Sequence, residues 1–368
     1  MTRPDLPDYP WDLVAPYAER ARRHPGGIVD LSIGSPVDPT PEAVRAALAQ
    51  ATDAHSYPQT AGTPALRSAI VAWYARRRGV PGLTPDEVLP TIGSKELVAL
   101  LPVLLGLGPG DVIVHPRAAY PTYAIGAAIV QATSFPSDDP DEWPQGTKLV
   151  WLNSPGNPDG HVNDAEYLAR AVRRARELGA VIANDECYAE LGWDGSWAHE
   201  PVPSILDPRV VGDDRSDVLS VYSLSKQSNM AGYRAAFLAG DAALVGKLLT
   251  VRKHAGLMLP APLQEAMVVA LDDDDAVRAQ VERYRARRGI LKPVLEASGF
   301  RIDHSEAGLY LWATAGEDAW TTMGRLADVG VLAGPGVFYG DFFPQHVRLS
   351  LTATDERIQA AAERLASL

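Results

Sequence analysis

Short apolar runs alternate with longer helix-forming stretches from about residue 40 onward. Apolar runs that are too short for helices and are bounded by turn or helix signals indicate buried β-strands. The clearest are residues 112–114, 149–152, 181–183 and 218–221. Because helical stretches separate these runs, the pattern predicts an α/β fold, with a mostly parallel sheet covered by helices on both faces.

Proline and capping residues mark where helices begin. Thr40-Pro41 and Thr63-Pro64 each place a capping hydroxyl before a proline suited to the first helical turn, so two helices are expected to start there. The most apolar run, residues 97–108, is interrupted by a proline and is far shorter than the ~20 residues of a membrane span. It therefore predicts a buried helix.

The C-terminal third has a different pattern. A charged helical stretch covers residues 277–297, and its several arginines are expected to form a solvated face. Strand candidates follow at residues 309–312 and 347–350. We therefore predict a large domain over residues 37–269 and a smaller α+β domain formed by residues 1–36 and 270–368. The two should pack tightly, since no long linker separates them.

Composition narrows the range of partners. Lys plus Arg total 34 against 46 Asp plus Glu, a formal net charge of −12, and such a field repels nucleic acid and anionic membranes. The single cysteine, Cys187, allows no intrachain disulfide. The first residues contain no apolar stretch typical of a signal peptide. We expect a cytoplasmic protein that acts on small molecules.

Ser223, Lys226 and Arg234 follow the apolar run that ends at residue 221. A lysine at a strand end faces a cleft, and its amine becomes a nucleophile or a Schiff-base partner where burial favours the neutral form. Hydroxyl donors and a forked cation nearby suit a phosphate group. Taken alone, the segment is also common on protein surfaces.

Other polar residues follow neighbouring strand candidates. Asp185 and Tyr188 come directly after residues 181–183, and Asn157 lies in a turn rich in Pro and Gly after residues 149–152. Ligands gather at the carboxyl ends of strands in α/β sheets, so these side chains are expected to lie together. A capping Asp, a packed Tyr and an ordinary turn would produce the same local sequences.

A further candidate lies at the start of the apolar helical run. Gly93, Ser94 and Lys95 precede this run, so their backbone N–H groups are expected at a helix N-terminus, where a phosphate binds readily. By itself this signal is weak.

Taken together, in this order and spacing, these segments resemble the fold-type I, class I and II aminotransferases, which use pyridoxal 5′-phosphate (PLP), from about residue 31 to residue 351. The resemblance implies that Lys226 holds PLP as a Schiff base and that Asp185 pairs with the pyridine nitrogen. Tyr188 and Asn157 would donate hydrogen bonds to the phenolate oxygen. The implied phosphate ligands are Gly93, Ser94, Lys95, Ser223 and Arg234.

The same resemblance implies a substrate pocket and a dimer. Tyr120 is similar to the aromatic residue that stacks on the cofactor ring. Tyr57 resembles a tyrosine that reaches the phosphate of the neighbouring subunit's cofactor, which implies a homodimer with shared active sites. Arg348 matches the arginine that grips the substrate α-carboxylate, and Gly34 and Asn157 would line that pocket. Residues 334–340 resemble a Pro-Gly loop at its border, although a hairpin turn would look the same.

Residues 34–41, 89–97 and 151–158 look like actinobacterial succinyldiaminopimelate aminotransferases. This implies ping-pong transfer of an amino group between glutamate and N-succinyl-2-amino-6-oxopimelate, in lysine biosynthesis. Lys95 and Arg117 are candidate cations for the further carboxylates of that substrate. An aminotransferase for aspartate or aromatic amino acids, or a PLP-dependent carbon–sulfur lyase, remains an alternative because all of them share the cofactor residues.

Other chemistries have less support. The eight histidines are scattered singly and lack the paired spacing of a zinc site, so no metal is expected. Cys187 lacks a recognisable base and is interpreted as a small buried thiol. Residues 106–110 end a helix and therefore form a turn, not a dinucleotide-binding loop. An aminotransferase-like transcription regulator would need a basic DNA-binding domain, and we expect none before residue 31.

Overall fold

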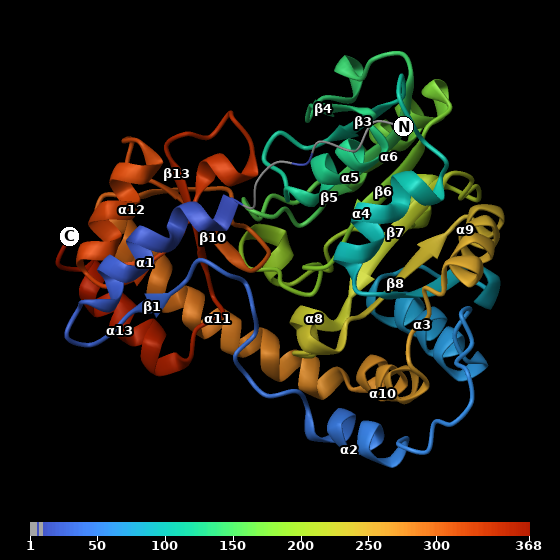
Figure 1. The fold of residues 1–368 in the computed structure, drawn as a ribbon, viewed down its shortest axis with the longest axis horizontal. Coiled ribbons are helices and arrows are strands. Elements are labelled where there is room, and N and C mark those ends of the chain that lie inside the picture. Colours follow the sequence, from blue (N-terminus) through green and yellow to red (C-terminus); the bar gives the residue numbers. More distant parts are fainter. Residues whose placement is uncertain (1–5, 7–9) are drawn as a thin grey trace.

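The computed structural model describes Leu6 and residues 10–368, which form two lobes (Figure 1). Within the described residues, the larger lobe is built on a seven-stranded sheet in the order β2-β8-β7-β6-β5-β3-β4. The strands are β2 (Val88–Ile92), β3 (Val112–His115), β4 (Thr133–Pro136), β5 (Thr147–Asn153), β6 (Val181–Asp185), β7 (Val218–Ser223) and β8 (Ala235–Gly240). Strand β8 pairs antiparallel with β2 and β7, and the other neighbours pair in parallel. The predicted mostly parallel sheet is confirmed.

Both faces of this sheet are buried under helices. In the interior strand β5, Leu149 and Trp151 join one apolar cluster, whereas the alternate residues Val150 and Leu152 join another. The first cluster includes residues of α4 (Ser94–Leu104), α5 (Thr122–Val130) and α9 (Ala242–Ala255), and the second includes residues of α3 (Pro64–Arg77), α6 (Ala165–Leu178) and α10 (Ala261–Asp272). A strand buried on both faces needs the continuous apolar run that the sequence shows.

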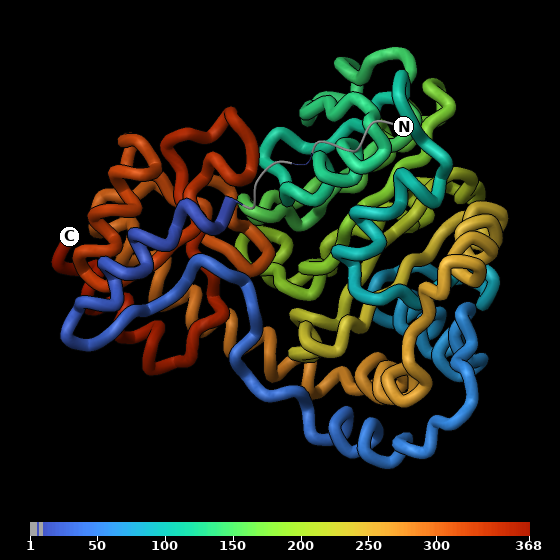
Figure 2. The backbone as a smooth tube through the Cα atoms, viewed as in Figure 1, coloured from blue at the N-terminus to red at the C-terminus, as the bar shows by residue number. Residues whose placement is uncertain are grey.

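The smaller lobe is α+β, as the fold prediction requires. Its antiparallel sheet has the order β12 (Gly334–Pro335), β13 (His346–Ser350), β10 (Tyr310–Thr314) and β9 (Arg301–Asp303). A parallel pair of β1 (Val29–Asp30) and β11 (Val331–Leu332) joins the N-terminal segment to this lobe, where it lies beside the C-terminal part in Figure 2. The helices of the lobe are α1 (Ala15–Arg22), α11 (Asp274–Ala297), α12 (Ala319–Asp328) and α13 (Asp355–Leu365).

Two helices begin near the predicted proline positions, but only one uses the expected cap. In α3, the Oγ1 of Thr63 accepts a hydrogen bond from the backbone N–H of Leu66 at 3.2 Å. In α2 (Glu42–Gln50), the N-cap residue is Pro41, and the capping role expected of Thr40 was wrong. The hydroxyl of Thr40 instead donates to the carbonyl of Asn229 at 2.8 Å, so it ties the chain before α2 to the segment after α8 (Leu224–Gln227).

The expectation of a solvated arginine face on α11 was wrong for Arg287. Its side chain is 3% exposed and donates to both carboxylate oxygens of Asp38, at 2.6 and 2.8 Å, and to Asp355 Oδ1 at 2.7 Å. This helix passes between the N-terminal segment and α13, so one arginine on it joins three parts of the chain. Sequence periodicity alone did not show these partners.

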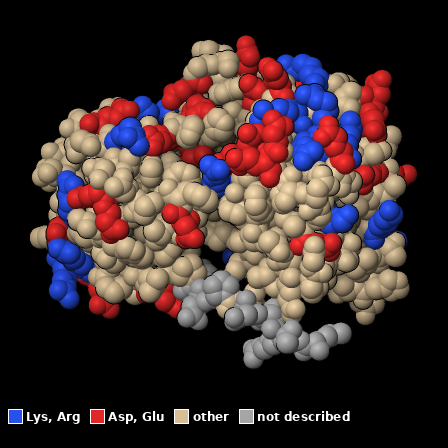
Figure 3. Space-filling view, turned by 90° about the horizontal axis from the view of Figure 1, so that it is seen from above, with Lys and Arg blue, Asp and Glu red and all other residues tan. Residues whose placement is uncertain are grey.

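Surface features complete the description of the fold. No helix in the described part of the chain is long and apolar enough to cross a membrane. The face in Figure 3 carries acidic and basic side chains side by side, with a furrow between the two lobes. On that face the two kinds of charge are mixed and do not form separate patches. Helix α7 (Pro208–Val211) is short and packs against α6.

Candidate active site

Three neighbouring parallel strands bring the predicted site residues to one edge of the sheet. Strands β5, β6 and β7 are adjacent and run in the same direction. Their carboxyl ends are therefore followed by the segment with Asn157, by Tyr188, and by α8 with Lys226. This edge is where ligands bind in open α/β sheets.

Lys226 is half-buried at this edge, and its amine donates a hydrogen bond to the carbonyl oxygen of Gly34. Burial lowers the pKa of Lys226, and the positive charges of Arg348 and Arg234 lower it further, against Tyr310 and Cys187, which raise it. A lowered pKa increases the fraction of neutral amine, which is the nucleophilic form. The structure thus places Lys226 where it can act as a nucleophile or a base.

Gly34 fits closely against Tyr310. A Cβ atom at this position would clash with the Tyr310 hydroxyl, so a glycine is needed for the approach of the two segments. The close approach brings the Gly34 carbonyl to Lys226. Gly34 therefore lies beside the Lys226 amine.

Asp185 is a buried acid without a cationic partner. Its carboxylate accepts hydrogen bonds from the Tyr123 hydroxyl at 3.1 Å and from the backbone N–H of Cys187 at 3.2 Å. Among the described residues it forms no ion pair, and burial raises its pKa. A buried carboxyl of this kind is stabilised by a ligand that brings a positive charge. The protonated pyridine nitrogen of PLP fits this requirement.

Arg348 is a buried cation with spare donor capacity. It is 4% exposed, and it donates from Nη1 to Asn157 Oδ1 at 2.8 Å and from Nη2 to the carbonyl of Ser32 at 2.7 Å. Its guanidinium lies over the rings of Tyr310 and Tyr339, at 3.9 and 4.7 Å from their centroids. Its Nε is buried and has no hydrogen-bond partner within the part of the chain that the structure describes. A carboxylate is the ligand that a guanidinium of this kind binds best.

Tyr310 connects these groups, although it was not among the site residues predicted from the sequence. The Tyr310 hydroxyl lies 3.2 Å from the Tyr188 hydroxyl, and its ring lies under Arg348. In the β10–β13 pair, Tyr310 lies opposite Ser350, diagonally from Arg348. Diagonal neighbours on one face of a sheet are within reach of long side chains. The pairing of β10 with β13, had it been known, would have shown that Tyr310 lies near Arg348.

A cradle for an anion lies beside Lys226. Gly93 has a φ of 82° before α4, and a Cβ there would clash with the guanidinium of Arg234, so a glycine is needed at this position. Ser94 is the first residue of α4, where free backbone N–H groups point outward. Ser223 donates from its hydroxyl to Ser225 Oγ at 2.7 Å. A helix N-terminus, hydroxyls and an exposed arginine together suit a phosphate.

Tyr120 also belongs to this cluster. Its ring meets the Tyr123 ring edge-on, with centroids 5.9 Å apart. Burial raises the pKa of Tyr120 to about 12, and the nearby carboxyl of Asp185 also raises it. An aromatic face beside Asp185 is consistent with a flat ligand ring.

Three of the residues predicted from the sequence have side chains that do not contact this cluster in the same chain. Lys95 is exposed, and only its backbone is part of the N-terminus of α4. Tyr57 is 94% exposed. Arg117 is exposed, with its guanidinium 3.4 Å from Glu142 Oε2 and 5.3 Å from the centroid of the Phe342 ring. Their roles are not explained by contacts within one chain.

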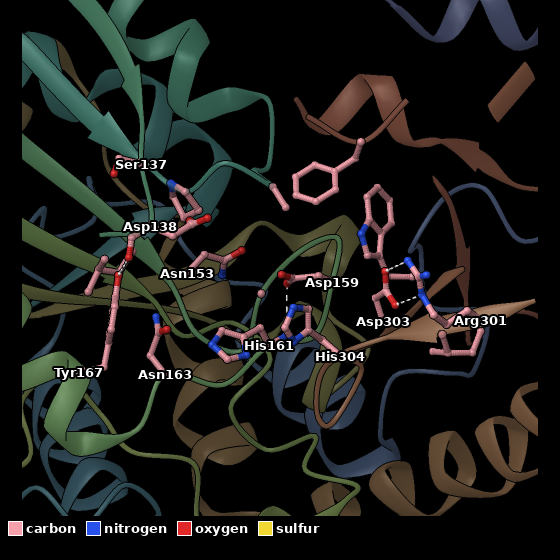
Figure 4. A pocket seen from close by; sticks show the side chains of 17 residues that line it. Ser137, Asp138, Asn153, Asp159, His161, Asn163, Tyr167, Arg301, Asp303 and His304 are labelled. Carbon is pink, nitrogen blue, oxygen red and sulfur yellow. Dashed lines mark hydrogen bonds and ion pairs between the residues drawn. The ribbon is translucent and has the colours of Figure 1, made fainter. Parts of the chain in front are cut away.

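A cavity of about 520 Å³ opens near the cluster (Figure 4). Asn153 and Gly156, from the segment that carries Asn157, contribute to its wall, as do Asp159, His161 and His304. The Nδ2 of Asn153 donates to the carbonyl of Asp185 at 2.8 Å, and its Oδ1 accepts from the backbone N–H of Asn157 at 2.8 Å. Asn153 is thus shared between the cavity wall and the support of the site.

Comparisons with known proteins agree with this geometry. Residues 27–365 match the family of class I and II aminotransferases. The chain is 53% identical over 362 residues to 4-dedimethylamino-4-oxo-anhydrotetracycline transaminase OxyQ of Streptomyces rimosus, a match that covers 98% of this chain and 99% of that protein. It is 51% identical over 361 residues to the probable aminotransferase Rv1178 of Mycobacterium tuberculosis, with 98% and 85% covered. A solved structure described as a probable N-succinyldiaminopimelate aminotransferase of Thermus thermophilus aligns with a TM-score of 0.87 and 30% identity, over 98% of this chain and 100% of that one.

Proposed function

The chain belongs to the class I and II aminotransferases, whose members use PLP, and we propose that Lys226, Asp185 and Arg348 divide the work of its site. The observation that carries the proposal is the buried Arg348, whose Nε has no hydrogen-bond partner among the described residues and whose charge acts on the amine of Lys226. An amino acid or keto acid has one α-carboxylate to bind and one α-carbon to present. Arg348 would bind the α-carboxylate, and Lys226 would act at the α-carbon.

When bound, PLP supplies a positively charged ring that accepts the electron pair left on the substrate α-carbon. Lys226 Nζ would take the proton from that carbon and pass it to the aldehyde carbon of PLP, and the lowered pKa of Lys226 favours the neutral amine that takes the proton. Asp185 keeps a negative charge where the ring nitrogen would lie. Tyr188 and Asn157 would hold the phenolate oxygen, and Gly93, Ser94, Ser223 and Arg234 would hold the phosphate.

Arg348 orients the substrate, because its fork of donors fixes the carboxylate in a plane. The rings of Tyr310 and Tyr339 exclude water from one side of that fork. Charged hydrogen bonds are stronger where water is excluded. The same arrangement holds the α-carbon of the substrate beside Lys226.

We propose glutamate and N-succinyl-2-amino-6-oxopimelate as the substrate pair. The three sequence stretches described above support this choice, as does the likeness to the Thermus thermophilus protein. A second candidate, the ketone in the name of the OxyQ relative, is favoured by the higher identity of 53%. The cofactor residues are equally suited to both, so the substrate pocket decides between them.

A panel of substrates tests this proposal. With PLP-loaded protein and 2-oxoglutarate, we expect glutamate to form when N-succinyl-LL-2,6-diaminopimelate is the amino donor. Aspartate and aromatic amino acids serve as competing donors, and cystathionine tests carbon–sulfur cleavage through release of pyruvate. The ketone 4-dedimethylamino-4-oxo-anhydrotetracycline is tested separately as an amino acceptor, with glutamate as the donor. Turnover of this ketone alone would keep the aminotransferase assignment and reject the succinylated substrate.

A further inference from the structure

Two histidines and a glutamate from distant parts of the sequence meet at the cavity. The ligand atoms of His161, His304 and Glu306 all lie within 4.8 Å of one another. The Nδ1 of His161 lies 2.9 Å from Glu306 Oε1, and the Nδ1 of His304 lies 4.0 Å from Glu306 Oε2. The two imidazole rings are 4.7 Å apart between centroids. Figure 4 shows both rings beside Asp159.

Backbone hydrogen bonds hold the two contributing segments together. The N–H of Ser305 donates to the carbonyl of Asp159 at 2.7 Å, and the N–H of Ala307 donates to the carbonyl of Gly160 at 3.1 Å. The carboxylate of Glu306 also accepts from the backbone N–H of Val162 at 3.0 Å. The three side chains are therefore held near one another before any ligand binds, which lowers the entropy cost of binding one.

The chemistry of these donors suits a transition metal. Imidazole nitrogens and a carboxylate oxygen are typical ligands of Zn²⁺, whereas Ca²⁺ and Mg²⁺ prefer oxygen ligands alone. Within the described residues, Glu306 forms ion pairs only with the two histidines, so no lysine or arginine competes for its oxygens. Asp159 lies close enough to interact with the charge of both histidines. The open cavity leaves room for water as a fourth ligand.

We propose that His161, His304 and Glu306 form a binding site for a divalent first-row transition metal, for which Zn²⁺ is the best candidate. The metal would replace the hydrogen bond between His161 and Glu306. The metal would connect the segment after Asn157 to the segment before Tyr310. Asn157 and Tyr310 both contact Arg348, and they do so from different lobes. The site lies outside the Lys226 cluster and does not depend on the identity of the substrate.

Competition between the PLP-loaded protein and a chromophoric Zn²⁺ chelator tests this proposal. We expect the wild-type protein to take up about one Zn²⁺ per chain, and Co²⁺ in its place to give the visible absorbance of a low-coordinate site. The His304→Ala variant should bind Zn²⁺ at least about tenfold more weakly, because loss of a direct ligand costs no less than loss of a supporting residue. His254→Ala, which removes an exposed histidine from α9, is the matched control and should bind as the wild type does.

Glu306→Gln provides a second variant, and circular dichroism checks that each variant is folded. A parallel loss of Zn²⁺ affinity in Glu306→Gln and His304→Ala, but not in His254→Ala, supports the site. The proposal is overturned if the wild type takes up no Zn²⁺, or if both site variants, once folded, bind it as tightly as the wild type.

Discussion

Arg348 lies with its guanidinium 3.9 Å from the centroid of the Tyr310 ring, while the Tyr310 hydroxyl lies 3.2 Å from that of Tyr188. Burial alone raises the pKa of Tyr310, but the positive charges of Arg348 and Lys226 outweigh burial and bring the pKa below its ordinary value of 10. The Tyr310 side chain thereby links Arg348, which is expected to bind the substrate carboxylate, to Tyr188, which is expected to bind the cofactor. Tyr310 is a positioning residue in this account.

Tyr310→Phe should lower kcat/KM by about 2- to 10-fold, the effect of one hydrogen bond. The charge that Tyr310 can carry raises the pKa of Lys226. Its loss should therefore shift to lower pH the limb of the pH–rate profile in which activity rises as Lys226 loses its proton. The measurement is kcat/KM against pH. Tyr339→Phe is the matched control, because it removes a buried hydroxyl that has no hydrogen-bond partner in residues 10–368. Identical profiles for the two variants would contradict this role.

The Asp185→Asn substitution should raise the stability of the cofactor-free protein but lower its turnover. Because burial raises the pKa of Asp185 in the folded protein, its contribution to stability is present below the unfolded-state pKa and is lost as pH rises through the folded one. At pH 7, the cofactor-free Asn variant should therefore melt at a higher temperature than the cofactor-free wild type. Turnover should fall by on the order of 100-fold, since a preorganised charge at the cofactor is lost.

Thermal melting with and without PLP checks this prediction. The wild type should gain more from PLP than the Asn variant does, because only the wild type offers a carboxylate to the ring. A cofactor-free Asn variant that is less stable than the wild type at pH 7 would show that Asp185 is not an unpaired buried acid.

The ion pair between Asp38 and Arg287 should be a pH-dependent source of stability. Burial raises the pKa of Asp38, but hydrogen bonds from Arg287 and Gln280 outweigh it and leave the pKa below 3.8. Its stabilisation is therefore full above pH 3.8 and is lost as pH falls through the lower folded value. The Asp38→Asn substitution should lower the free energy of unfolding by about 1–3 kcal/mol at pH 7.

Urea unfolding at neutral and acidic pH measures this cost. The difference between Asp38→Asn and the wild type should shrink below about pH 4, where the wild-type carboxyl begins to take up a proton. Asp275→Asn is the control, because that side chain is 91% exposed and, among the described residues, forms an ion pair only with Arg278 on its own helix. A cost for Asp38→Asn that does not change with pH would contradict the assignment.

Tyr57 tests the proposed homodimer with shared sites. The side chain is 94% exposed, which suits a residue that serves a second subunit. If so, Tyr57→Ala and Lys226→Ala proteins should each be weakly active alone, but mixed dimers should contain one intact site and recover activity. Coexpression of two differently tagged chains, followed by tandem purification, measures this recovery. Mixed dimers that are no more active than the two parents would reject sharing of the site through Tyr57.

The sequence predicted the central sheet, because short apolar runs indicate strands, and it predicted that the polar residues after those strands lie at one edge of the sheet. Asp185 and Lys226 could be placed together for this reason, once the sheet was taken as parallel. The position of Tyr310 depends on the pairing of β10 with β13, which local sequence does not fix. The partners of Arg287 and the meeting of His161 with His304 depend on how distant segments pack, and no spacing along the chain shows that.

The most direct test of the account is an absorbance spectrum of the purified protein with PLP, followed by addition of glutamate and then of N-succinyl-LL-2,6-diaminopimelate to separate samples. The wild type and the control Lys253→Ala, an exposed lysine on α9, should show the near-visible band of lysine-bound cofactor, and both donors should convert it. Lys226→Ala should lack that band and lose turnover by about 1,000-fold or more. A Lys226→Ala protein with the wild-type band and wild-type turnover would contradict the central claim.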